Sequence, residues 1–414
     1  MSMKVLPVMG GGWMVGMNIT TRLLMLSPSI LILAIISTYN VVSLGAKPDR
    51  KTDSTNAFVL VWNEACGSIG KSTIYVPKGT YFIGSALKFS GRNCETIFNN
   101  MGITLRIEGT LLAPTEYMAL GNVTHWISFE SVVGVTITGG LLDGQGTSLW
   151  ACKSNAYGNC PVGTTSLGFT NSENIVINGL RSVNSQLFHV VINGCENVKL
   201  QRLKIMAAGK SPNTDGIHVQ QSNNVEITHS TIGTGDDCIS IGAGTTNLAI
   251  HKILCGPGHG ISIGSLGKSW DEAGVENVTV TAVVLKGTQN GVRIKSWGRP
   301  SNSYVKNVLF KAIKMDVVQN PIIIDQNYCP NNIGCPGQDS GVKISNIAYE
   351  DIRGSSATKV AVKFDCSPMY RCTNITMENV RLTYNQDLAT SSCNNAGGTA
   401  LGVIQPTSCI VQTG

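Results

Sequence analysis

From about residue 126 onward, the sequence repeats one pattern. A short run of alternating apolar and polar residues, rich in β-branched side chains, is followed by a small or polar turn that often contains asparagine. Alternation with a period of two is typical of β-strands. Examples are VTITG (135–139), NIVINGL (174–180), NVKLQRLKI (197–205), NVEITHSTI (224–232), NLAIHKI (247–253), NVTVTAVVL (277–285), NVLFKAIKM (307–315) and VKISNIAYEDI (342–352). Strands this short and this regular predict a solenoid.

A second set of segments predicts the register of the solenoid. The segments that begin at Asp215, Asp237 and His259 start 22 residues apart, and two more follow at Asn290 and Asn320, after 31 and 30 residues. A constant period with occasional insertions is expected of a parallel β-helix, in which neighbouring rungs lie about 4.8 Å apart and insertions form loops. Apolar residues should stack in its interior: Ile217 and Val219, Ile239 and Ile241, Ile261 and Ile263, Val292 and Ile294, and Ile322 and Ile324.

One segment has a different pattern. TDSTNAFVLVWNEAC (52–66) combines helix-capping residues with apolar positions at helical spacing, and it predicts a helix over about 54–66 that closes the N-terminal end. No other helix-length segment is expected after the N-terminal region. The predicted fold class is therefore all-β, with one β-helix domain over 39–414.

Composition agrees with an all-β chain, because glycine is frequent (46 of 414 residues), while aromatic residues (6%) and charged residues (14%) are few. The formal net charge of +6 is compatible with a polyanionic partner, whether nucleic acid, anionic lipid or acidic polysaccharide, and equally with an ordinary solvated surface.

Thirteen cysteines indicate an oxidising compartment. Close spacing suggests six short-loop disulfides and leaves Cys195 unpaired; the pairs are Cys66 and Cys94, Cys152 and Cys160, Cys238 and Cys255, Cys329 and Cys335, Cys366 and Cys372, and Cys393 and Cys409. No CxxC pair favours a zinc site.

The N-terminal region predicts secretion. Arg22 precedes an apolar run over 23–37, which has signal-peptide length and is short for a membrane span. We expect an N-terminal extension plus signal peptide over 1–38; a membrane anchor is the alternative. Sequons at Asn122, Asn277 and Asn374 are compatible with glycosylation on this route.

Stacking of the coils gathers candidate catalytic groups. Asp215, Asp237 and His259 should form one column on successive coils, with Asp236 beside it. Glycoside hydrolysis requires two carboxyl roles, one group that protonates the leaving oxygen and one that activates water or attacks the sugar. Carboxylates about one rung apart repel one another, and this repulsion can keep a proton on one of them.

The strand that follows adds two cations. Arg293 and Lys295 are two residues apart and should share the outward face, where they can bind a substrate carboxylate. Taken singly, each of these residues is an ordinary surface group. Calcium binding by the three aspartates is a further alternative, which the neighbouring cations disfavour by repelling the ion.

Strict alternation would turn Asp215 toward the buried side, together with Ile217, where a bare carboxylate is costly. The chain is therefore expected to bend at glycines such as Gly216 and Gly260 and to turn the acids out into a groove.

Four segments carry a specific resemblance. SPNTDGIHV (211–219), GTGDDCISIG (233–242), CGPGHGISIGSLG (255–267) and RIKSW (293–297) resemble, in order, the signature blocks of the polygalacturonases, glycoside hydrolase family 28. The likeness covers nearly the whole chain after the signal region, from YNVVSLGAKPDRKTDSTNAF (39–58) through NPIIIDQNYCP (320–330) to the last cysteines.

The resemblance implies a right-handed parallel β-helix of the pectin-lyase-like type. It also implies a secreted, monomeric enzyme of the plant cell wall that hydrolyses α-1,4-galacturonosyl bonds of polygalacturonan or pectin with inversion. No cofactor, metal, nucleic acid or membrane partner is expected after signal cleavage. By similarity, Asp236 is the general acid, Asp215 and Asp237 hold and deprotonate the water, and His259 tunes their protonation. Residues expected to bind substrate are Arg293, Lys295, Asn213 and Tyr328.

Two rival functions remain at this point. A pectate-lyase-like β-elimination enzyme also acts on this polymer with a β-helix, but resemblance there would call for calcium-binding acids and an arginine base. A non-catalytic, pectin-binding solenoid would bind the polymer without releasing reducing ends.

Overall fold

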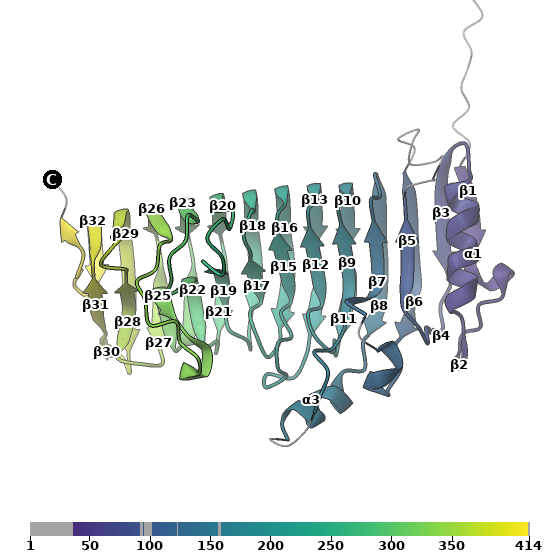
Figure 1. Ribbon diagram of the computed structural model, residues 1–414, viewed down its shortest axis with the longest axis horizontal. Coiled ribbons are helices and arrows are strands. Elements are labelled where there is room, and N and C mark those ends of the chain that lie inside the picture. The colour runs from purple at the N-terminus through teal and green to yellow at the C-terminus, as the bar shows by residue number, and fades with distance from the viewer. Residues whose placement is uncertain (1–35, 92–93, 95–101, 122, 156–158, 413–414) are drawn as a thin grey trace, which may run out of the picture. The chain divides into compact units, whose positions relative to one another are not determined.

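The computed structural model describes residues 36–91, 94, 102–121, 123–155 and 159–412. Its strands lie side by side along one long axis (Figure 1), as expected of a solenoid. The predicted signal region up to residue 35 and the sequon Asn122 lie outside the described residues. The predicted domain start at 39 falls inside the first described strand, β1 (Ile36–Asn40).

Two parallel sheets form the walls of the solenoid. The smaller sheet takes one strand from each coil, in chain order: β5 (Leu87–Ser90), β7 (His125–Glu130), β9 (Thr165–Thr170), β12 (Val190–Asn193), β15 (Ile217–Gln220), β17 (Ile239–Ile241), β19 (Ile261–Leu266), β22 (Asn290–Trp297), β25 (Asn320–Tyr328), β28 (Val360–Asp365) and β31 (Thr390–Asn394). Each strand hydrogen-bonds to the strands of the coils before and after it.

The larger sheet carries the rest of each coil. Its strands are β1, β2 (Asp49–Asp53), β3 (Lys71–Val76), β4 (Thr80–Phe82), β6 (Ile103–Leu112), β8 (Val135–Asp143), β10 (Glu173–Asn178), β11 (Arg181–Val183), β13 (Glu196–Gln201), β14 (Lys204–Met206), β16 (Asn223–Gly233), β18 (Thr246–Cys255), β20 (Val275–Thr281), β21 (Val284–Lys286), β23 (Tyr304–Lys311), β24 (Lys314–Val318), β26 (Lys343–Glu350), β27 (Arg353–Ser356), β29 (Cys372–Tyr384), β30 (Asp387–Leu388), β32 (Ala396–Gln405) and β33 (Val411–Gln412). Only β29–β30 pairs antiparallel among the pairings described.

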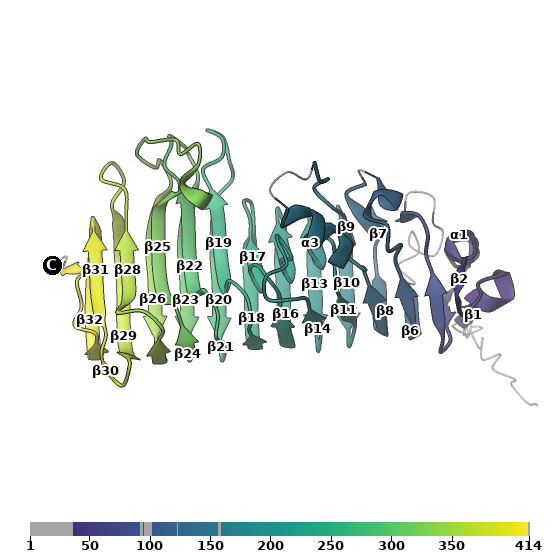
Figure 2. The ribbon, with the colours of Figure 1, turned by 90° about the horizontal axis from the view of Figure 1, so that it is seen from below.

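The predicted register is confirmed. Ile217 is paired with Ile239, Ile239 with Ile261, and Ile261 with Val292, which in turn is paired with Ile322. These side chains are at most 1% exposed, so they form a continuous column in the core. The longer coils accommodate their extra residues in loops, and Figure 2 shows those after β19, β22 and β25 projecting on the same side as helix α3 (Thr147–Lys153).

Asparagines at the turns form a second column, on the surface. Asn277 donates its amide to Oδ1 of Asn247 at 3.0 Å, and Asn307 donates to Asn277 at 3.2 Å. Asn346 and Asn374 continue the series, with distances of 3.1 and 3.0 Å. Each has a positive φ between 51° and 57°, a conformation that asparagine tolerates better than most residues. The exposed sequons Asn277 and Asn374 are therefore members of a hydrogen-bonded ladder.

Helices are few. The predicted helix is confirmed as α1 (Thr55–Cys66), preceded by Ser54, at the N-terminal end of the solenoid (Figure 1). Its Phe58 and Trp62 are buried against the rings of Tyr81 and Phe89, at centroid distances of 6.2 and 4.8 Å.

Helix α3 was not expected, because its seven residues are too few to show a helical period. It buries Leu149 and Trp150 against the body of the solenoid. Three 3-10 turns complete the described elements: η1 (Val41–Leu44), η2 (Tyr117–Leu120) and η3 (Pro330–Asn332).

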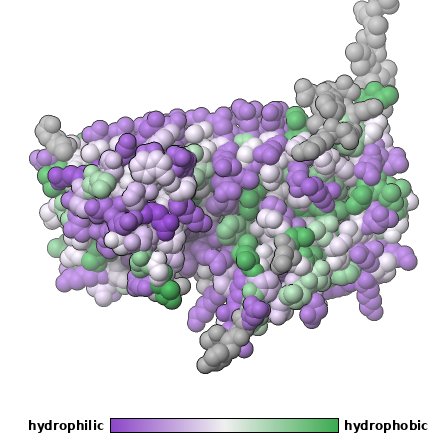
Figure 3. All heavy atoms as spheres, in the orientation of Figure 1, coloured by the Kyte–Doolittle hydropathy of each residue, from purple (hydrophilic) through white to green (hydrophobic). Residues whose placement is uncertain are grey.

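All six expected disulfides are present, and Cys195 is free and buried. Among the described residues, no helix is long and apolar enough to cross a membrane. Hydrophilic residues cover most of the face in Figure 3, with apolar side chains in small groups between them.

Candidate active site

The candidate catalytic residues lie in the short segments that precede β15, β17 and β19. Backbone hydrogen bonds stack these segments: the Gly216 amide donates to the carbonyl of Asp237 at 2.9 Å, and the His259 amide donates to the carbonyl of Asp236 at 2.8 Å. The predicted column is therefore formed, although each acid lies just before its strand rather than within it.

Asp237 is the most enclosed of the three carboxylates, with 1% of its surface exposed. Its Oδ1 accepts from Arg293 at 3.1 Å and from the Ser262 hydroxyl at 2.7 Å, and its Oδ2 accepts from Lys295 at 2.9 Å. Burial alone would raise the pKa of Asp237, but Lys295 and Arg293 outweigh it and hold the pKa below its usual range. Asp237 therefore ionises at lower pH than an ordinary aspartate.

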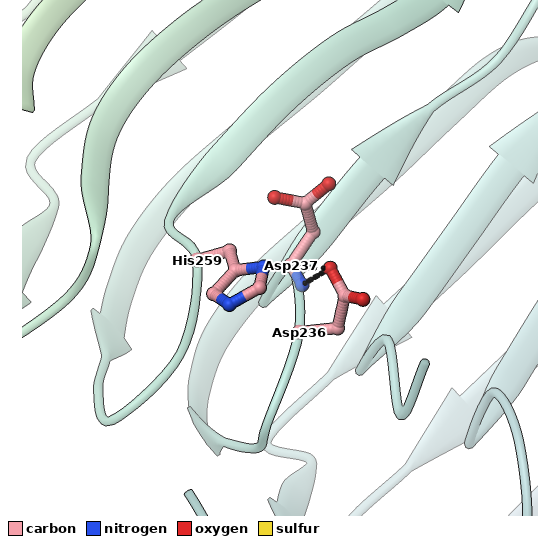
Figure 4. A group of neighbouring side chains, drawn as sticks. All are labelled: Asp236, Asp237 and His259. Carbon is pink, nitrogen blue, oxygen red and sulfur yellow. Dashed lines mark hydrogen bonds and ion pairs between the residues drawn. The ribbon is translucent and has the colours of Figure 1, made fainter. Parts of the chain in front are cut away.

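Asp236 faces the other way and remains partly exposed, with 20% of its side chain accessible. Its Oδ1 lies 3.0 Å from Nδ1 of His259, and the same oxygen accepts from the Asp237 amide at 2.8 Å. Figure 4 shows the three side chains gathered where the two segments meet. The amide of Asn213 lies 3.5 Å from the second Asp236 oxygen. Asp236 and His259 are thus the members of the cluster that an approaching molecule can reach.

Asp215 does not turn out into an open groove, as the sequence had suggested. It is only 6% exposed, and burial together with the negative charges of Asp236 and Asp237 raises its pKa well above the ordinary value. Asp237 is buried as well, so the expectation that the acids turn out into a groove was wrong for Asp215 and Asp237, while Asp236 is partly exposed. The cost of burial is offset by the cations at Asp237, whereas at Asp215 burial favours the protonated form.

Glycines were expected to permit a bend before the strands, and the structure requires them for two different reasons. Gly260 has φ of +89°, and a Cβ there would lie 2.1 Å from the carbonyl oxygen of Asn290. Gly216 has no positive φ; instead, a Cβ there would lie 2.5 Å from the carbonyl oxygen of Cys238. Close approach between coils, as well as backbone conformation, therefore requires glycine.

Arg293 and Lys295 share one face of β22, as predicted, and extend beneath the ring of Tyr328. The Arg293 Cζ lies 5.9 Å and the Lys295 Nζ 5.2 Å from the ring centroid, within the range of cation–π attraction. Trp297 packs edge-on against the same ring at 5.4 Å. Both cations are less than 10% exposed, which makes their positions well defined.

Ser262 belongs to the cluster and was missed in the sequence. Its hydroxyl donates to Asp237 and accepts from Nε of Arg293 at 3.0 Å, so it links the carboxylate to the guanidinium. The register contained the signal, since Ser262 is the partner of Arg293 on the neighbouring strand. His218, two strands further, is held by Ser240 at 2.7 Å, and burial lowers its pKa.

The main alternative is that this cluster binds a metal ion. Ligand atoms of Asp236, Asp237 and His259 lie within 4.8 Å of one another, which is compatible with an ion by distance alone. Both oxygens of Asp237, however, already accept from cations. Two buried positive charges at this carboxylate oppose a divalent cation, so the donor set is better suited to acid–base work than to metal binding.

Comparisons with known proteins agree in family and fold. A model of the glycosyl hydrolases of family 28 matches residues 66–409. The chain is 59% identical over 373 residues to a polygalacturonase of Prunus persica, covering 90% of this chain and 93% of that one. It is 43% identical to polygalacturonase-2 of Solanum lycopersicum, covering 84% and 75%.

Among solved structures, endo-xylogalacturonan hydrolase from Aspergillus tubingensis superimposes with a TM-score of 0.72 at 24% identity, over 91% of this chain and 100% of that one. An exopolygalacturonase from Thermotoga maritima gives a TM-score of 0.70 at 19% identity, over 83% and 88%. At these identities the likeness concerns the fold, and the predicted right-handed parallel β-helix is confirmed.

Proposed function

The chain belongs to the glycosyl hydrolases of family 28, and we propose on that basis that it is a secreted polygalacturonase, which hydrolyses α-1,4-galacturonosyl bonds of polygalacturonan with inversion. The observation that carries the proposal is the pairing of a buried, ionised carboxylate, Asp237, with a partly exposed one, Asp236, on adjacent residues. An inverting glycosidase needs both a charged and a protonated carboxyl group at the same pH.

In the proposed reaction, Asp236 gives its proton to the glycosidic oxygen as the bond from that oxygen to C1 breaks. A water held by Asp215 and Asp237 attacks C1 from the opposite face and loses its proton to a carboxylate. The new C1–O bond forms opposite the broken one, so the anomeric configuration inverts.

The environment of each acid supports this division. Asp237 stays charged because of its two cations, so it is the group that accepts the proton of the water at acidic pH. Asp215 has a raised pKa and is enclosed, so it positions the water and adds basic capacity only as pH rises. Asp236 is the partly exposed acid that a glycosidic oxygen can reach, and His259 beside it orients it.

Binding of the sugar carboxylate falls to Arg293 and Lys295. Both make an ion pair with the same carboxylate, Asp237, so two cations share one anion in direct contact next to the reacting groups. A galacturonate carboxylate supplies a second negative charge, and Arg293 can bind it in bidentate fashion. Tyr328 and Asn213, at the rim of the same cluster, contact the ring of the bound sugar.

The cellular location and the oligomeric state are also part of the proposal. Six disulfides suit an oxidising compartment, and we place the enzyme in the plant cell wall as a monomer, after cleavage of a signal peptide within 1–38. Pectin polysaccharide is its partner.

The first prediction concerns the two adjacent acids. Asp236→Asn should lower kcat on polygalacturonate by at least about 100-fold, because the proton donor is removed, with little effect on thermal unfolding. Asp237→Asn should also abolish activity and in addition destabilise the fold by about 3–5 kcal/mol, because Arg293 and Lys295 lose their buried counterion. Release of reducing ends and calorimetric unfolding measure the two effects.

Three outcomes would contradict the proposal. Activity of Asp236→Asn equal to that of the unmodified enzyme would exclude its role as proton donor. A product that absorbs in the ultraviolet and requires calcium would indicate β-elimination. Binding of the polymer without release of reducing ends would indicate a non-catalytic solenoid.

A further inference from the structure

A basic depression lies on the larger sheet, outside the cluster described above. It has a volume of about 440 Å³. It lies at the turns that lead into β24 and β27 and at the middle of β29. Its lining residues are Ala312, Ile313, Lys314, Asp351, Arg353, Asn379 and Arg381. None of them belongs to the smaller sheet, which carries the catalytic candidates.

Three cations of the depression form one row along the solenoid axis. Lys314 is paired in register with Arg353, and Arg353 with Arg381, so the three charges lie on successive coils. Neighbouring parallel strands are about 4.8 Å apart, and all three side chains are exposed. We call Lys314, Arg353 and Arg381 the basic row.

The basic row is not neutralised by the protein. In the described part of the chain, none of its members makes an ion pair, whereas Lys311 nearby is paired with Glu350 at 2.8 Å. Among the described residues, Asp351 is the only acidic one that lines the depression, and it accepts from the amide of Asn379 at 3.4 Å. Three like charges on adjacent rungs repel one another, and a bound anion would relieve this repulsion.

The spacing of the row indicates the shape of that anion. A linear polymer that lies along the solenoid axis, with one negative charge on each unit, would present successive charges to successive coils. Galacturonan is a polymer of this kind, because each of its α-1,4-linked units carries a carboxylate. The described residues that line the depression include no aromatic side chain, which disfavours stacked nucleobases.

We propose that the basic row is a second, non-catalytic binding surface for de-esterified galacturonan. The choice of polymer rests on the proposed function, but the surface itself is separate from the active site. Its effect is to retain the enzyme on the polymer between cleavage events and so to raise the local concentration of substrate at the catalytic cluster.

Binding is tested in an Asp236→Asn background, so that the polymer is not degraded. The triple variant Lys314→Gln, Arg353→Gln, Arg381→Gln should lose most of the retardation in native gels that contain polygalacturonate at low salt. The matched control is Lys51→Gln, Lys71→Gln, Lys78→Gln, which removes the same charge from exposed positions in the N-terminal coils. This control should keep its retardation. Equal retardation of the two triple variants would overturn the proposal.

Two further measurements separate this proposal from the proposed function. With the catalytic residues intact, the triple variant of the basic row should hydrolyse short oligogalacturonides at an unchanged rate, while KM on the long polymer rises several-fold. Highly methyl-esterified pectin should cause no retardation. If double-stranded DNA retarded the protein equally, the surface would be a general polyanion site, and this result would contradict its assignment to galacturonan. If the unmodified enzyme cleaves no polymer, the proposed function fails, while the gel comparison still decides the role of the row.

Discussion

At the scale of single residues, Asp215 and Asp237 differ in how their burial is compensated. Asp237 is surrounded by Arg293, Lys295 and Ser262, and its charge is stabilised. Asp215 is buried and interacts with the negative charges of Asp236 and Asp237, so its charge is destabilised. Two chemically identical groups therefore have opposite effects on the stability of the fold as pH changes.

The effect at Asp215 predicts a gain in stability on mutation. Its folded-state pKa is raised, so the folded state binds more protons than the unfolded state once pH exceeds the usual aspartate range, and stability falls as pH rises toward the folded-state pKa. Asp215→Asn removes this penalty. It should raise the free energy of unfolding at neutral pH and flatten its decline as pH rises above the usual aspartate range, because the variant has no carboxylate to charge.

Thermal unfolding across this pH range measures the change, and activity of the variant should be lost. Asp237 provides the opposite control, because its pKa is lowered: the stability it contributes is present at neutral pH and disappears as pH falls through the folded-state pKa. An Asp215→Asn variant that is less stable than the unmodified protein at pH 7 would contradict the conclusion that burial destabilises the charged form of Asp215.

At the scale of single elements, the bend before β19 positions His259. Gly260→Ala should therefore reduce both activity and stability, because φ is +89° and the added Cβ would lie 2.1 Å from a backbone oxygen. We expect a loss of at least about 2 kcal/mol in unfolding free energy. Gly287 is the matched control: its φ is also positive, at +60°, but a Cβ there would meet nothing within 4 Å.

Gly287→Ala should cost only about 1 kcal/mol, the usual price of a left-handed conformation, and leave kcat unchanged. Chemical denaturation and initial rates on polygalacturonate report the two quantities. Equal losses for the two variants would show that backbone conformation alone, without close approach between coils, requires glycine at 260.

These elements could be predicted because coils that stack in register give the sequence a periodic pattern. The 22-residue interval was enough to align Ile217, Ile239 and Ile261 and to gather the acids. Strand alternation placed Asp215 on the buried side, and its burial was missed because a bare carboxylate was expected to avoid the core. Helix α3 was missed because seven residues are too few to show a helical period, and Ser262 was overlooked although its register was available.

The basic row also results from the stacking of coils in register. Lys314, Arg353 and Arg381 lie 39 and 28 residues apart, intervals that differ from each other and from the 22-residue period. Insertions of different length separate them, and only the strand pairing in the structure brings them into line. Residue spacing alone therefore does not predict a column of charges when the coils differ in length.

At the scale of the whole molecule, α1 covers one end of the solenoid (Figure 1). An uncovered end would expose unpaired strand edges and apolar rungs, which recruit further copies. Phe58→Asp should displace the helix, because this side chain is fully buried, and should cause self-association. Leu60→Asp is the control on the same helix, since Leu60 is already 43% exposed.

Light scattering at increasing protein concentration distinguishes the two variants. Phe58→Asp should give particles that grow with concentration, and Leu60→Asp should behave as the unmodified protein does. A Phe58→Asp protein that is destabilised but does not associate would show that α1 stabilises the first coil without protecting its edge.

The position of α1 in the chain has a consequence for biosynthesis. The ribosome makes residues 55–66 before the coils that follow them, so the closed end of the solenoid is the first part to leave the exit tunnel. Each later coil needs only the coil before it as a template. The protein can therefore fold in the direction of translation, and at any moment only the newest rung is open to other nascent chains.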